Sequence, residues 1–474
     1  MIDVSKLTIH SAHEKMLKKE FSPVDLTKAY LENIQKKNPS IHAYLEVYED
    51  VITQAEYAKN LFEEGKATLL TGIPIALKDN ILLKGKRVGA ASKILEGFIA
   101  PYDATAVEKL KREGVVFLGR TNMDEFAMGG STENSAYGIT RNPHNLEKVP
   151  GGSSGGSAAA VVMNGALAAL GSDTGGSVRQ PASFCGCVGL KPTYGAVSRH
   201  GLIAMGSSLD QIGPIGKTVS DVEILFHVIS GTDPLDSTSH YPEHTEVPGT
   251  IKIGVPASIL DIDGLHPDVR KNFEESVEKL KKMGYTIVPI DMPGLSSALA
   301  VYYIVMFAEV SSNLSRFDGV KYGLHREGGS LLEDYLVTRR EGFGAEVRRR
   351  ILLGTYVLSS GYYDAYYSKA NSLREEIKKT FKSLFETVDV IMTPTAPTPA
   401  FAIGEKSHDP LSMYLADIFT VPANIAGNPA ISVPSGISKE GMSQLPLGVQ
   451  FLGRPYDEKV LFTVAKKFLG EETL

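Results

Sequence analysis

The sequence predicts an α/β fold in which layers of helices surround one large β-sheet. Short apolar runs that read as buried strands alternate with helical patterns along most of the chain. The apolar runs lie at residues 72–78, 115–118, 166–170, 251–255 and 388–392, and the clearest helical patterns at 269–283 and 362–385. Because no linker-like stretch or repeat period interrupts this order, we expect one domain over residues 1–474.

The first part of the chain, up to about residue 65, reads as helices. Ser22, Pro23 and Asp25 stand where a helix N-cap, a first-turn proline and a third-position acid belong. The apolar run at 72–78 then predicts a buried strand that ends at Lys78. Residues 234–248 are rich in Asp, Ser, Thr, His and Pro, and we expect them to form a surface excursion.

Composition excludes several classes of protein. With 474 residues, 43% of them hydrophobic, the chain can bury a large core. Its formal net charge of -6 does not favour a protein that grips nucleic acid unaided, so any RNA partner should be held mainly by another subunit. The only cysteines, Cys185 and Cys187, lie in an apolar stretch and are interpreted as buried small hydrophobes, not as a metal or redox site.

Targeting signals are not expected either. The first ten residues have neither the charged nor the apolar region of a signal peptide. The longest apolar run that we single out, 158–170, is broken by Asn164 and Gly165 and is shorter than the roughly 20 residues that span a bilayer. Together with the low cysteine content, this predicts a soluble cytoplasmic protein without a membrane partner.

Two Gly/Ser elements carry the chemistry, at residues 151–157 and 173–177. A helix-like and a strand-like segment separate them, which is enough chain to leave and return, so Ser153 and Ser177 can meet. The second element reads as strand, tight glycine turn and helix. That geometry exposes a serine and aims successive main-chain N–H groups at one point, where an oxyanion can be held.

A serine nucleophile needs a base, and neither element contains histidine. The candidate base is Lys78. A lysine accepts a proton only when it is neutral, which requires a pKa lowered by burial or by the lack of a nearby acid.

The quoted motifs resemble the signature of the amidase signature family. The matching segments are Gly151 to Ala160, Gly171 to Ala182 and Gly189 to Thr193. The resemblance implies the amidase signature fold, one large mixed central β-sheet covered by helices on both sides. It also implies a catalytic core at about 72–220, a specificity region at about 295–425, and a helical region, 1–65, packed on the core.

The resemblance implies a Ser-cisSer-Lys triad. Ser177 would attack the amide carbonyl, Ser153 would relay the proton, and neutral Lys78 would act as the base. The peptide bond between Gly152 and Ser153 would be cis. The oxyanion hole would consist of the main-chain N–H groups of Thr174, Gly175, Gly176 and Ser177. Asp79, Asp173, Arg179 and Lys191 are expected to hold the local hydrogen-bond network without taking part in catalysis.

Within the family, further segments resemble the glutamine-hydrolysing subunits of tRNA-dependent amidotransferases. These segments are residues 302–303, 311–319, 348–355, 359–367 and 413–417. Free glutamine is a zwitterion, and by resemblance Arg350 would bind its α-carboxylate and Asp417 its α-ammonium. Tyr303 would close the pocket, while Gly129 and Ser131 would line its amide end. Tyr302 in place of Tyr303, and Arg349 in place of Arg350, stay open alternatives.

The implied reaction is hydrolysis of glutamine to glutamate and ammonia through a γ-glutamyl ester on Ser177. Ammonia would pass to a B subunit that activates Glu-tRNA(Gln), or Asp-tRNA(Asn), and a small C subunit would complete a heterotrimer. The tRNA would be contacted mainly through the B subunit. This chain itself would need no cofactor: ATP and magnesium would belong to the partner, which agrees with the lack of a G-x-x-x-x-G-K-[ST] pattern here.

Three alternatives are weighed against this function. A stand-alone amidase acting on a hydrophobic amide would need an apolar pocket in place of Arg350 and Asp417. An α/β-hydrolase would use the G-x-S-x-G pattern at 151–155, but that motif must follow a strand, and residues 141–150 are polar and contain proline. A non-catalytic scaffold would leave Lys78, Ser153 and Ser177 without a purpose.

Overall fold

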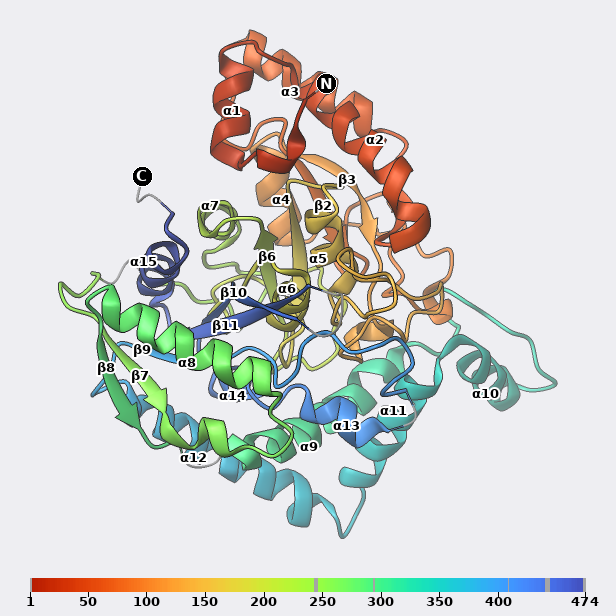
Figure 1. Ribbon diagram of the computed structural model, residues 1–474. Helices are drawn as coiled ribbons and strands as arrows, with labels where there is room; N and C mark the ends of the chain where they lie inside the picture. The colour runs from red at the N-terminus through yellow and green to blue at the C-terminus, as the bar shows by residue number, and fades with distance from the viewer. Residues whose placement is uncertain (1, 243–245, 293–294, 408, 440–443, 472–474) are drawn as a thin grey trace.

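The computed structural model describes residues 2–242, 246–292, 295–407, 409–439 and 444–471. A single mixed sheet of 11 strands runs through them (Figure 1). The strands are β1 (Tyr44–Val47), β2 (Pro74–Lys78), β3 (Val116–Thr121), β4 (Ala168–Asp173), β5 (Val188–Lys191), β6 (Gln211–Gly216), β7 (Lys252–Pro256), β8 (Thr286–Ile290), β9 (Val390–Pro394), β10 (Ala430–Ser438) and β11 (Leu445–Gly453). Their spatial order is β1-β3-β2-β4-β6-β5-β10-β11-β9-β7-β8.

Helices cover both faces of this sheet. They are α1 (Ile9–Leu17), α2 (Pro23–Ile41), α3 (Val51–Glu63), α4 (Thr105–Arg112), α5 (Gly155–Val162), α6 (Arg179–Cys185), α7 (Val219–Ile229), α8 (Pro267–Lys282), α9 (Leu295–Asn313), α10 (Leu331–Gly342), α11 (Ala345–Val357), α12 (Lys369–Leu384), α13 (Pro410–Leu415), α14 (Val421–Ala426) and α15 (Glu458–Leu469). Strand β11 shows the two faces directly. Gln450 bonds to Arg179 of α6, whereas its neighbour Phe451 packs on Phe468 of α15. Successive side chains of a strand point to opposite faces, so α6 and α15 cover opposite sides, and the predicted fold class is confirmed.

The position of the site follows from three parallel strands. Strand β2 lies between β3 and β4 and runs parallel to both, while most of the remaining pairs are antiparallel. The carboxyl ends of parallel strands meet at one edge of a sheet. Lys78, the last residue of β2, and Asp173, the last residue of β4, therefore emerge side by side.

The strands predicted from apolar runs coincide with β2, β3, β4, β7 and β9. The N-terminal region also contains the expected helices, α1 to α3, which lie together at one end of the molecule (Figure 1). Ser22 caps α2 as the sequence predicted: its hydroxyl accepts the main-chain N–H of Asp25, and the Asp25 carboxylate accepts the main-chain N–H of Ser22. The interpretation of this region as helices alone was wrong, because β1 adds to the sheet beside β3. Only four residues long, β1 is defined by this long-range pairing and not by a local pattern.

Residues 234–248 carry no helix or strand where they are described, and 243–245 lie outside the described residues. The segment is nonetheless anchored to the protein. The Asp236 carboxylate is buried and binds the Arg199 guanidinium, with a closest nitrogen-to-oxygen distance of 2.7 Å. The predicted surface excursion is thus confirmed, since all of its described residues except Asp236 are exposed or partly exposed, and one ion pair anchors it to the rest of the protein.

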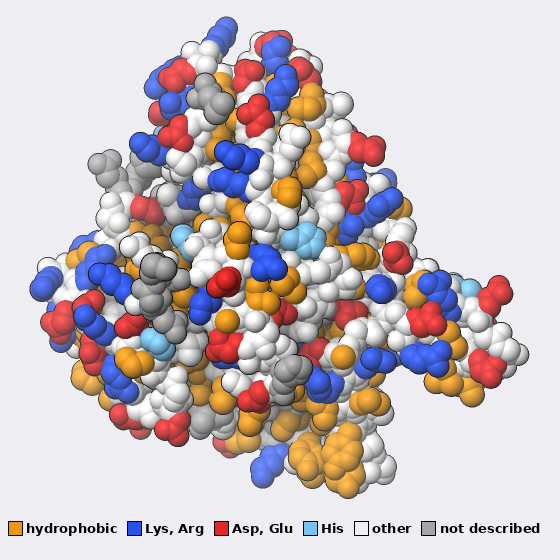
Figure 2. All heavy atoms as spheres, turned by 45° about the vertical axis from the view of Figure 1, so that its right-hand side comes forward, with side chains coloured by type: hydrophobic (Ala, Val, Ile, Leu, Met, Phe, Trp, Pro, Cys, Tyr) orange, Lys and Arg blue, Asp and Glu red, His pale blue; other side chains and the backbone are white. Residues whose placement is uncertain are grey.

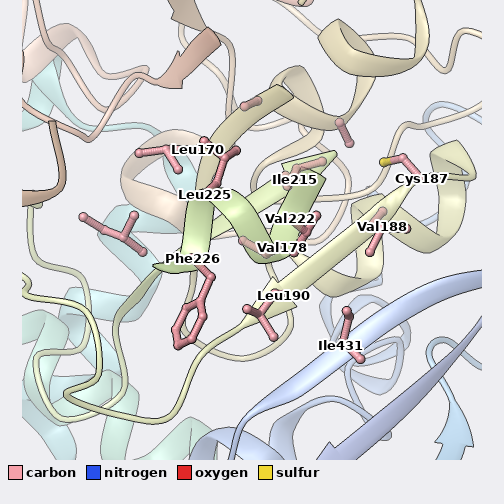
Figure 3. Packing of buried hydrophobic residues seen from close by; sticks show 14 of the residues in the cluster. Leu170, Val178, Cys187, Val188, Leu190, Ile215, Val222, Leu225, Phe226 and Ile431 are labelled. Carbon is pink, nitrogen blue, oxygen red and sulfur yellow. The ribbon is translucent and has the colours of Figure 1, made fainter. Parts of the chain in front are cut away.

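The main hydrophobic core includes the segment that follows Ser177. Val178 is fully buried and lies against glycines of β4, β5 and β6, while Leu170, Leu190 and Ile215 of the same strands belong to the same core (Figure 3). Cys187 points into the same cluster, and both cysteines are buried and free. The interpretation of the cysteines as small hydrophobes therefore holds, and the turn that carries Ser177 rests on a packed core.

Helix α9 is the most apolar long helix of the described chain, and it was not predicted from the sequence. The segment Ser297–Arg316, 20 residues long and mostly α9, could cross a membrane by length and composition, but half of it is buried inside the protein. Val305, Met306 and Val310 are fully buried in the main core. Helix α9 is accordingly a core helix, packed against α11 and α12.

A glycine permits the closest approach of α9 and α11. A Cβ atom added to Gly354 would collide with the main-chain carbonyl of Phe307 and lie 2.7 Å from Cβ of Ser311. Neither helix can yield by a side-chain rotation, because the obstructing carbonyl belongs to the backbone. The spacing of the two helices, and of the side chains they carry, depends on this contact.

We predict that Gly354→Ala destabilises the protein, although the same exchange in an exposed helix stabilises it. The added methyl group overpacks the α9–α11 contact, and we expect a loss of about 1–3 kcal/mol in the free energy of unfolding. Urea unfolding followed by circular dichroism measures it. Leu352→Ala, at an exposed position of the same helix, is the control, and an equal effect of the two changes would contradict the packing argument.

Candidate active site

Lys78 is fully buried, and its amine lies within a ring of serine oxygens. The Nζ atom is 2.7 Å from Ser153 Oγ and 2.7 Å from Ser154 Oγ. On the other side it lies 2.9 Å from Ser172 Oγ and 3.1 Å from the Ser172 carbonyl oxygen. The structure therefore brings the predicted base and the predicted relay serine into hydrogen-bond contact.

Burial lowers the pKa of Lys78 to about 7, against the opposing charges of Asp124, Asp173 and Asp210. The apolar strand β2 carries the amine out of water, and desolvation disfavours its charged form. An amine with this pKa is neutral in a large fraction of molecules near pH 7. Lys78 can thus accept a proton under ordinary conditions, which an exposed lysine cannot do.

Ser177 lies in the turn between β4 and α6, and the residue is 8% exposed. The main-chain N–H of Ser154 donates to the Ser177 carbonyl oxygen at 3.0 Å, which fixes this turn against the segment that carries Ser153. The peptide bond between Gly152 and Ser153 is cis, as the resemblance implied. Contact between the Ser153 and Ser177 hydroxyl groups stays a prediction.

One of the four predicted oxyanion donors already has an acceptor. The N–H of Gly176 donates to Asp173 Oδ1 at 2.9 Å, and the N–H of Val178 donates to Oδ2 at 3.1 Å. The Asp173 side chain organises the turn by binding these two amides. The expectation that all four N–H groups face the substrate is therefore corrected for Gly176, and Thr174, Gly175 and Ser177 remain as predicted donors.

The turn is anchored by a buried network around Arg179. The guanidinium binds both carboxylate oxygens of Asp173 at 3.1 Å, and it also donates to Asn424 at 2.6 Å and Gln450 at 2.8 Å. Burial would raise the pKa of Asp173, but the Arg179 charge and the Asn424 amide hold it well below its usual range. Asp173 therefore stays ionised, and the network has the structural part expected for Asp173 and Arg179.

A cavity of about 130 Å³ contains most of the predicted substrate-binding residues. It is lined by Gly129, Ser131, Glu133, Asn134, Ala345, Glu346, Arg349, Arg350, Lys406, Ser407, Pro410, Met413 and Tyr414. The buried Oγ of Ser131 has no hydrogen-bond partner among the described residues. The cavity is thus polar and carries charges of both signs, unlike the apolar pocket that a hydrophobic amide requires.

Of the two candidate arginines, Arg350 points inward. It is only 4% exposed, whereas the Arg349 side chain is 45% exposed. Arg350 Nε donates to Glu346 Oε1 at 2.7 Å, and its guanidinium lies 5.4 Å from the ring centre of Tyr414. Tyr414 also donates to Glu346, at 2.9 Å, so one carboxylate orients both side chains.

The two adjacent tyrosines of α9 have different surroundings. The Tyr303 hydroxyl donates to Asp417 Oδ2 at 3.2 Å, and its ring stacks on Tyr414 at 4.1 Å between centres. Tyr302 instead lies against the turn between β4 and α6 that carries Ser177, here called the nucleophile turn. A Cβ atom added to Gly175 in this turn would be 2.6 Å from the Tyr302 ring. Burial raises the pKa of Asp417 to about 7, although the Tyr303 hydroxyl lowers it.

The sequence pattern of the amidase family matches residues 25–462. The chain belongs to the amidase family. Among curated relatives, the A subunit of the glutamyl-tRNA(Gln) amidotransferase of Geobacter metallireducens is 50% identical, over 98% of this chain and 97% of its own length. The corresponding protein of the same name from Ruminiclostridium cellulolyticum is 52% identical, over 99% of this chain and 98% of its own.

Solved amidase structures agree with this assignment. The crystal structure of the glutamyl-tRNA(Gln) amidotransferase A subunit from Thermotoga maritima superposes with a TM-score of 0.81 at 45% identity, covering 98% of this chain and 95% of that one. A peptide amidase from Stenotrophomonas maltophilia gives a TM-score of 0.83 at 28% identity, covering 99% and 97%. The family resemblance inferred from the signature motifs is thereby confirmed.

Sequence reasoning missed several residues that shape this amidase site. Ser154 and Ser172 belong to the recognised motifs, but only the folded chain shows that both contact Lys78. Glu346 stands four residues before Arg350, a helical ion-pair spacing that could have revealed it. Asp124 was also missed: it accepts the N–H groups of residues 131, 132 and 134 and so shapes the loop that lines the cavity.

No group of His, Cys, Asp and Glu side chains that could hold a metal ion occurs within the described parts of this amidase chain.

We predict that Asp173→Asn strongly destabilises the protein, because the Arg179 charge would then be buried without its carboxylate. We expect a loss of about 3–5 kcal/mol in the free energy of unfolding. Glu341→Gln is the matched control, since it breaks the exposed Arg326–Glu341 pair and should cost below about 1 kcal/mol. Denaturant unfolding of both variants provides the comparison, and losses of similar size would show that the Asp173 network is not an anchor.

Proposed function

We propose that this amidase-family chain is the glutamine-hydrolysing subunit of a tRNA-dependent amidotransferase. It converts glutamine to glutamate and ammonia through a γ-glutamyl ester on Ser177. The observation that carries the proposal is the buried amine of Lys78, 2.7 Å from Ser153 Oγ, on a chain about half identical to its amidotransferase relatives. No second base is needed for acyl transfer, because the amine can take and return the same proton.

The triad works by proton relay. Neutral Lys78 takes the proton of Ser153 as Ser153 takes that of Ser177, whose Oγ attacks the carbonyl carbon of the side-chain amide. The Lys78 ammonium then returns the proton through Ser153 to the leaving nitrogen, the carbon–nitrogen bond breaks and ammonia departs. Water attacks the ester by the same relay, which releases glutamate and restores the Ser177 hydroxyl.

The negative charge of the tetrahedral intermediate falls on the former carbonyl oxygen. Main-chain N–H groups of Thr174, Gly175 and Ser177 stabilise it, and each such donor typically contributes a few kcal/mol to the transition state. Gly176 does not contribute in this arrangement, because Asp173 holds its N–H. Its part is conformational: its φ of 136° lies in a region that favours glycine, and the tight turn requires it.

Glutamine is bound through its two charged groups. Arg350 pairs with the α-carboxylate and Asp417 with the α-ammonium, and Tyr303 lies between these residues in contact with both. Gly129 and Ser131 line the amide end, where the free Ser131 hydroxyl offers a hydrogen bond. Because these groups offer a cation, an anion and a free hydroxyl, they are suited to a zwitterionic amino acid that carries an amide.

Ammonia passes to a B subunit, which holds ATP and magnesium, contacts the tRNA and activates its misacylated end, and a small C subunit completes the cytoplasmic heterotrimer. The relatives are named as A subunits of an amidotransferase, which supports an assembly of more than one subunit. Exposed hydrophobic side chains on α11 and in the segment after it also offer a surface on which a partner subunit could bind. Leu352, Leu353, Tyr356, Tyr362, Tyr363 and Tyr366 are all exposed, and Figure 2 shows hydrophobic side chains gathered at the lower edge of the molecule, where α11 ends. The whole chain, 1–474, is proposed to act as one domain.

A stand-alone amidase is the second candidate, favoured by the close superposition on the peptide amidase. The charges argue against it: Arg350 lines the cavity, Asp417 is linked to Arg350 through Tyr303, and an uncharged amide would pair with neither. Turnover of peptide amides, tested beside glutamine, separates the two functions.

We predict that Ser177→Ala lowers glutamine turnover at least about a thousandfold, since the chain loses its nucleophile. The purified chain is incubated with glutamine, alone and with the B and C subunits, and the ester on Ser177 is trapped by acid quenching and mass spectrometry. Ser383→Ala, an exposed serine of α12, should leave turnover unchanged. Turnover that survives in Ser177→Ala would exclude the mechanism, and hydrolysis of other amides without glutamine would exclude the substrate.

We further predict that kcat/KM for glutamine falls steeply below pH 7. Lys78 must be neutral and Asp417 ionised, and both groups have a pKa of about 7, so both become protonated as the pH decreases. The logarithm of kcat/KM should then rise with a limiting slope of about two on the acid side. In Asp417→Asn the residual activity should show a slope of about one. A slope of one in the wild type would contradict the assignment of one of these groups.

A further inference from the structure

We propose that Gln180 is a positioning residue that couples the substrate loop, residues 129–131, to the relay serine, Ser153. The inference rests on the proposed glutaminase function and adds a residue to which neither the triad nor the substrate-binding set assigns a part. Gln180 does not touch the reacting atoms. It acts through the two backbone segments that it joins.

The side-chain amide of Gln180 is fully buried and forms one hydrogen bond at each end. Its Oε1 accepts the N–H of Gly152 at 2.8 Å, and its Nε2 donates to the carbonyl oxygen of Gly130 at 3.0 Å. Gln180 stands three residues after Ser177, and its own N–H donates to the Gly176 carbonyl oxygen at 2.8 Å. One residue thus connects the nucleophile turn, the relay segment and the substrate loop.

The chemistry of the two partners fixes the orientation of this amide. A main-chain N–H can only donate, and a main-chain carbonyl can only accept. Because Gly152 presents an N–H and Gly130 a carbonyl, rotating the amide by half a turn would oppose donor to donor and acceptor to acceptor. A side chain without both an acceptor and a donor cannot make this bridge.

The bridge is also tightly packed. A Cβ atom added to Gly151 would lie 2.8 Å from Gln180 Oε1, and one added to Gly130 would lie 3.3 Å from Nε2. The glycines on both sides therefore let the backbone approach the amide closely. A displacement of one segment is transmitted to the other, because little free space separates them from the amide.

The two ends of the bridge are adjacent to functional groups. Gly152 precedes Ser153, whose Oγ lies 2.7 Å from Lys78 Nζ. Gly130 stands between Gly129 and Ser131, which both line the cavity. Since a misplacement of about 1 Å at a reacting group can cost roughly a hundredfold in rate, the position of the loop sets the efficiency of the relay. Glutamine that seats the loop correctly also aligns Ser153.

Two substitutions separate the two hydrogen bonds of the Gln180 amide, the bond from the Gly152 N–H and the bond to the Gly130 carbonyl. In Gln180→Glu the new carboxylate still accepts from Gly152, but it faces the Gly130 carbonyl with a second acceptor and repels it. We expect KM for glutamine to rise about tenfold at pH 8, while the labelling of Ser177 by diisopropyl fluorophosphate, which does not use the glutamine loop, stays within about twofold of wild type. In Gln180→Met both hydrogen bonds are lost, so KM rises and labelling slows, each about tenfold.

The pH dependence of KM in Gln180→Glu distinguishes a positioning role from a purely structural one, which would not change with pH. As the pH is lowered, the carboxylate of Gln180→Glu takes up a proton, and its hydroxyl can then donate to Gly130 as the amide did. The ratio of KM in Gln180→Glu to KM in wild type should therefore fall toward one at acid pH. In Gln180→Met the ratio should not change with pH.

The measurements use the full chain with the B and C subunits, and melting temperatures are recorded alongside. Gln54→Glu is the control, because Gln54 also bonds to a main-chain N–H, that of Phe117, but far from the site. A Gln180→Glu variant with wild-type KM, or with a KM ratio independent of pH, would overturn the coupling. If wild type labels with the fluorophosphate but does not hydrolyse glutamine, the proposed function itself fails, which is a different result.

Discussion

The structure of the site depends on the contact between the Lys78 amine and the Ser153 hydroxyl. The amine can accept a proton in this contact only if its pKa is lowered far enough for the neutral form to be populated. Burying a charged amine is costly, and the structure meets this cost by shifting its pKa instead of pairing it directly with a carboxylate. Serine oxygens surround the amine, while Asp124, Asp173 and Asp210 act on it only through their charges. Moving one of these carboxylates into contact would favour the ammonium form and abolish the base. The arrangement of the whole sheet edge can be understood from this constraint.

No carboxylate of the described residues contacts Lys78 directly. The carboxylate of Asp173, beside the turn that carries Ser177, is instead neutralised by Arg179. Asp173 uses its two oxygens to bind Arg179 and the amides of Gly176 and Val178. The ion pair is therefore an anchor and not a catalytic group, and it explains why the Gly176 N–H is withdrawn from the oxyanion site. The same carboxylate shapes the turn without contacting the Lys78 amine, although its charge opposes the lowering of the Lys78 pKa by burial.

The sequence predicted what local patterns determine. The strand that ends at Lys78, the two Gly/Ser elements and the helix start at Ser22 are encoded in consecutive residues, and all of them were found where expected. Strand β1, the ion pair of Asp236, the acceptor of the Gly176 N–H and the bridge made by Gln180 were not predicted. Each joins segments far apart in the chain or depends on a side-chain orientation, and neither is visible in a pattern of residue types.

The residues proposed to bind the substrate are positioned by different elements from those that position Lys78 and its serines. The triad stands on the sheet edge and its packed core, whereas Tyr303 and Arg350 project from α9 and α11, two helices whose backbones touch at Gly354. Such a contact fixes the distance between the helices but not which side chains they carry toward the cavity. Exchanging residues on these two helices would therefore alter the cavity while Lys78 and its serines stay in place. Under the proposed function, substrate choice follows from where Arg350 and Asp417 place their charges, and the edge that carries Lys78 contributes only the reaction.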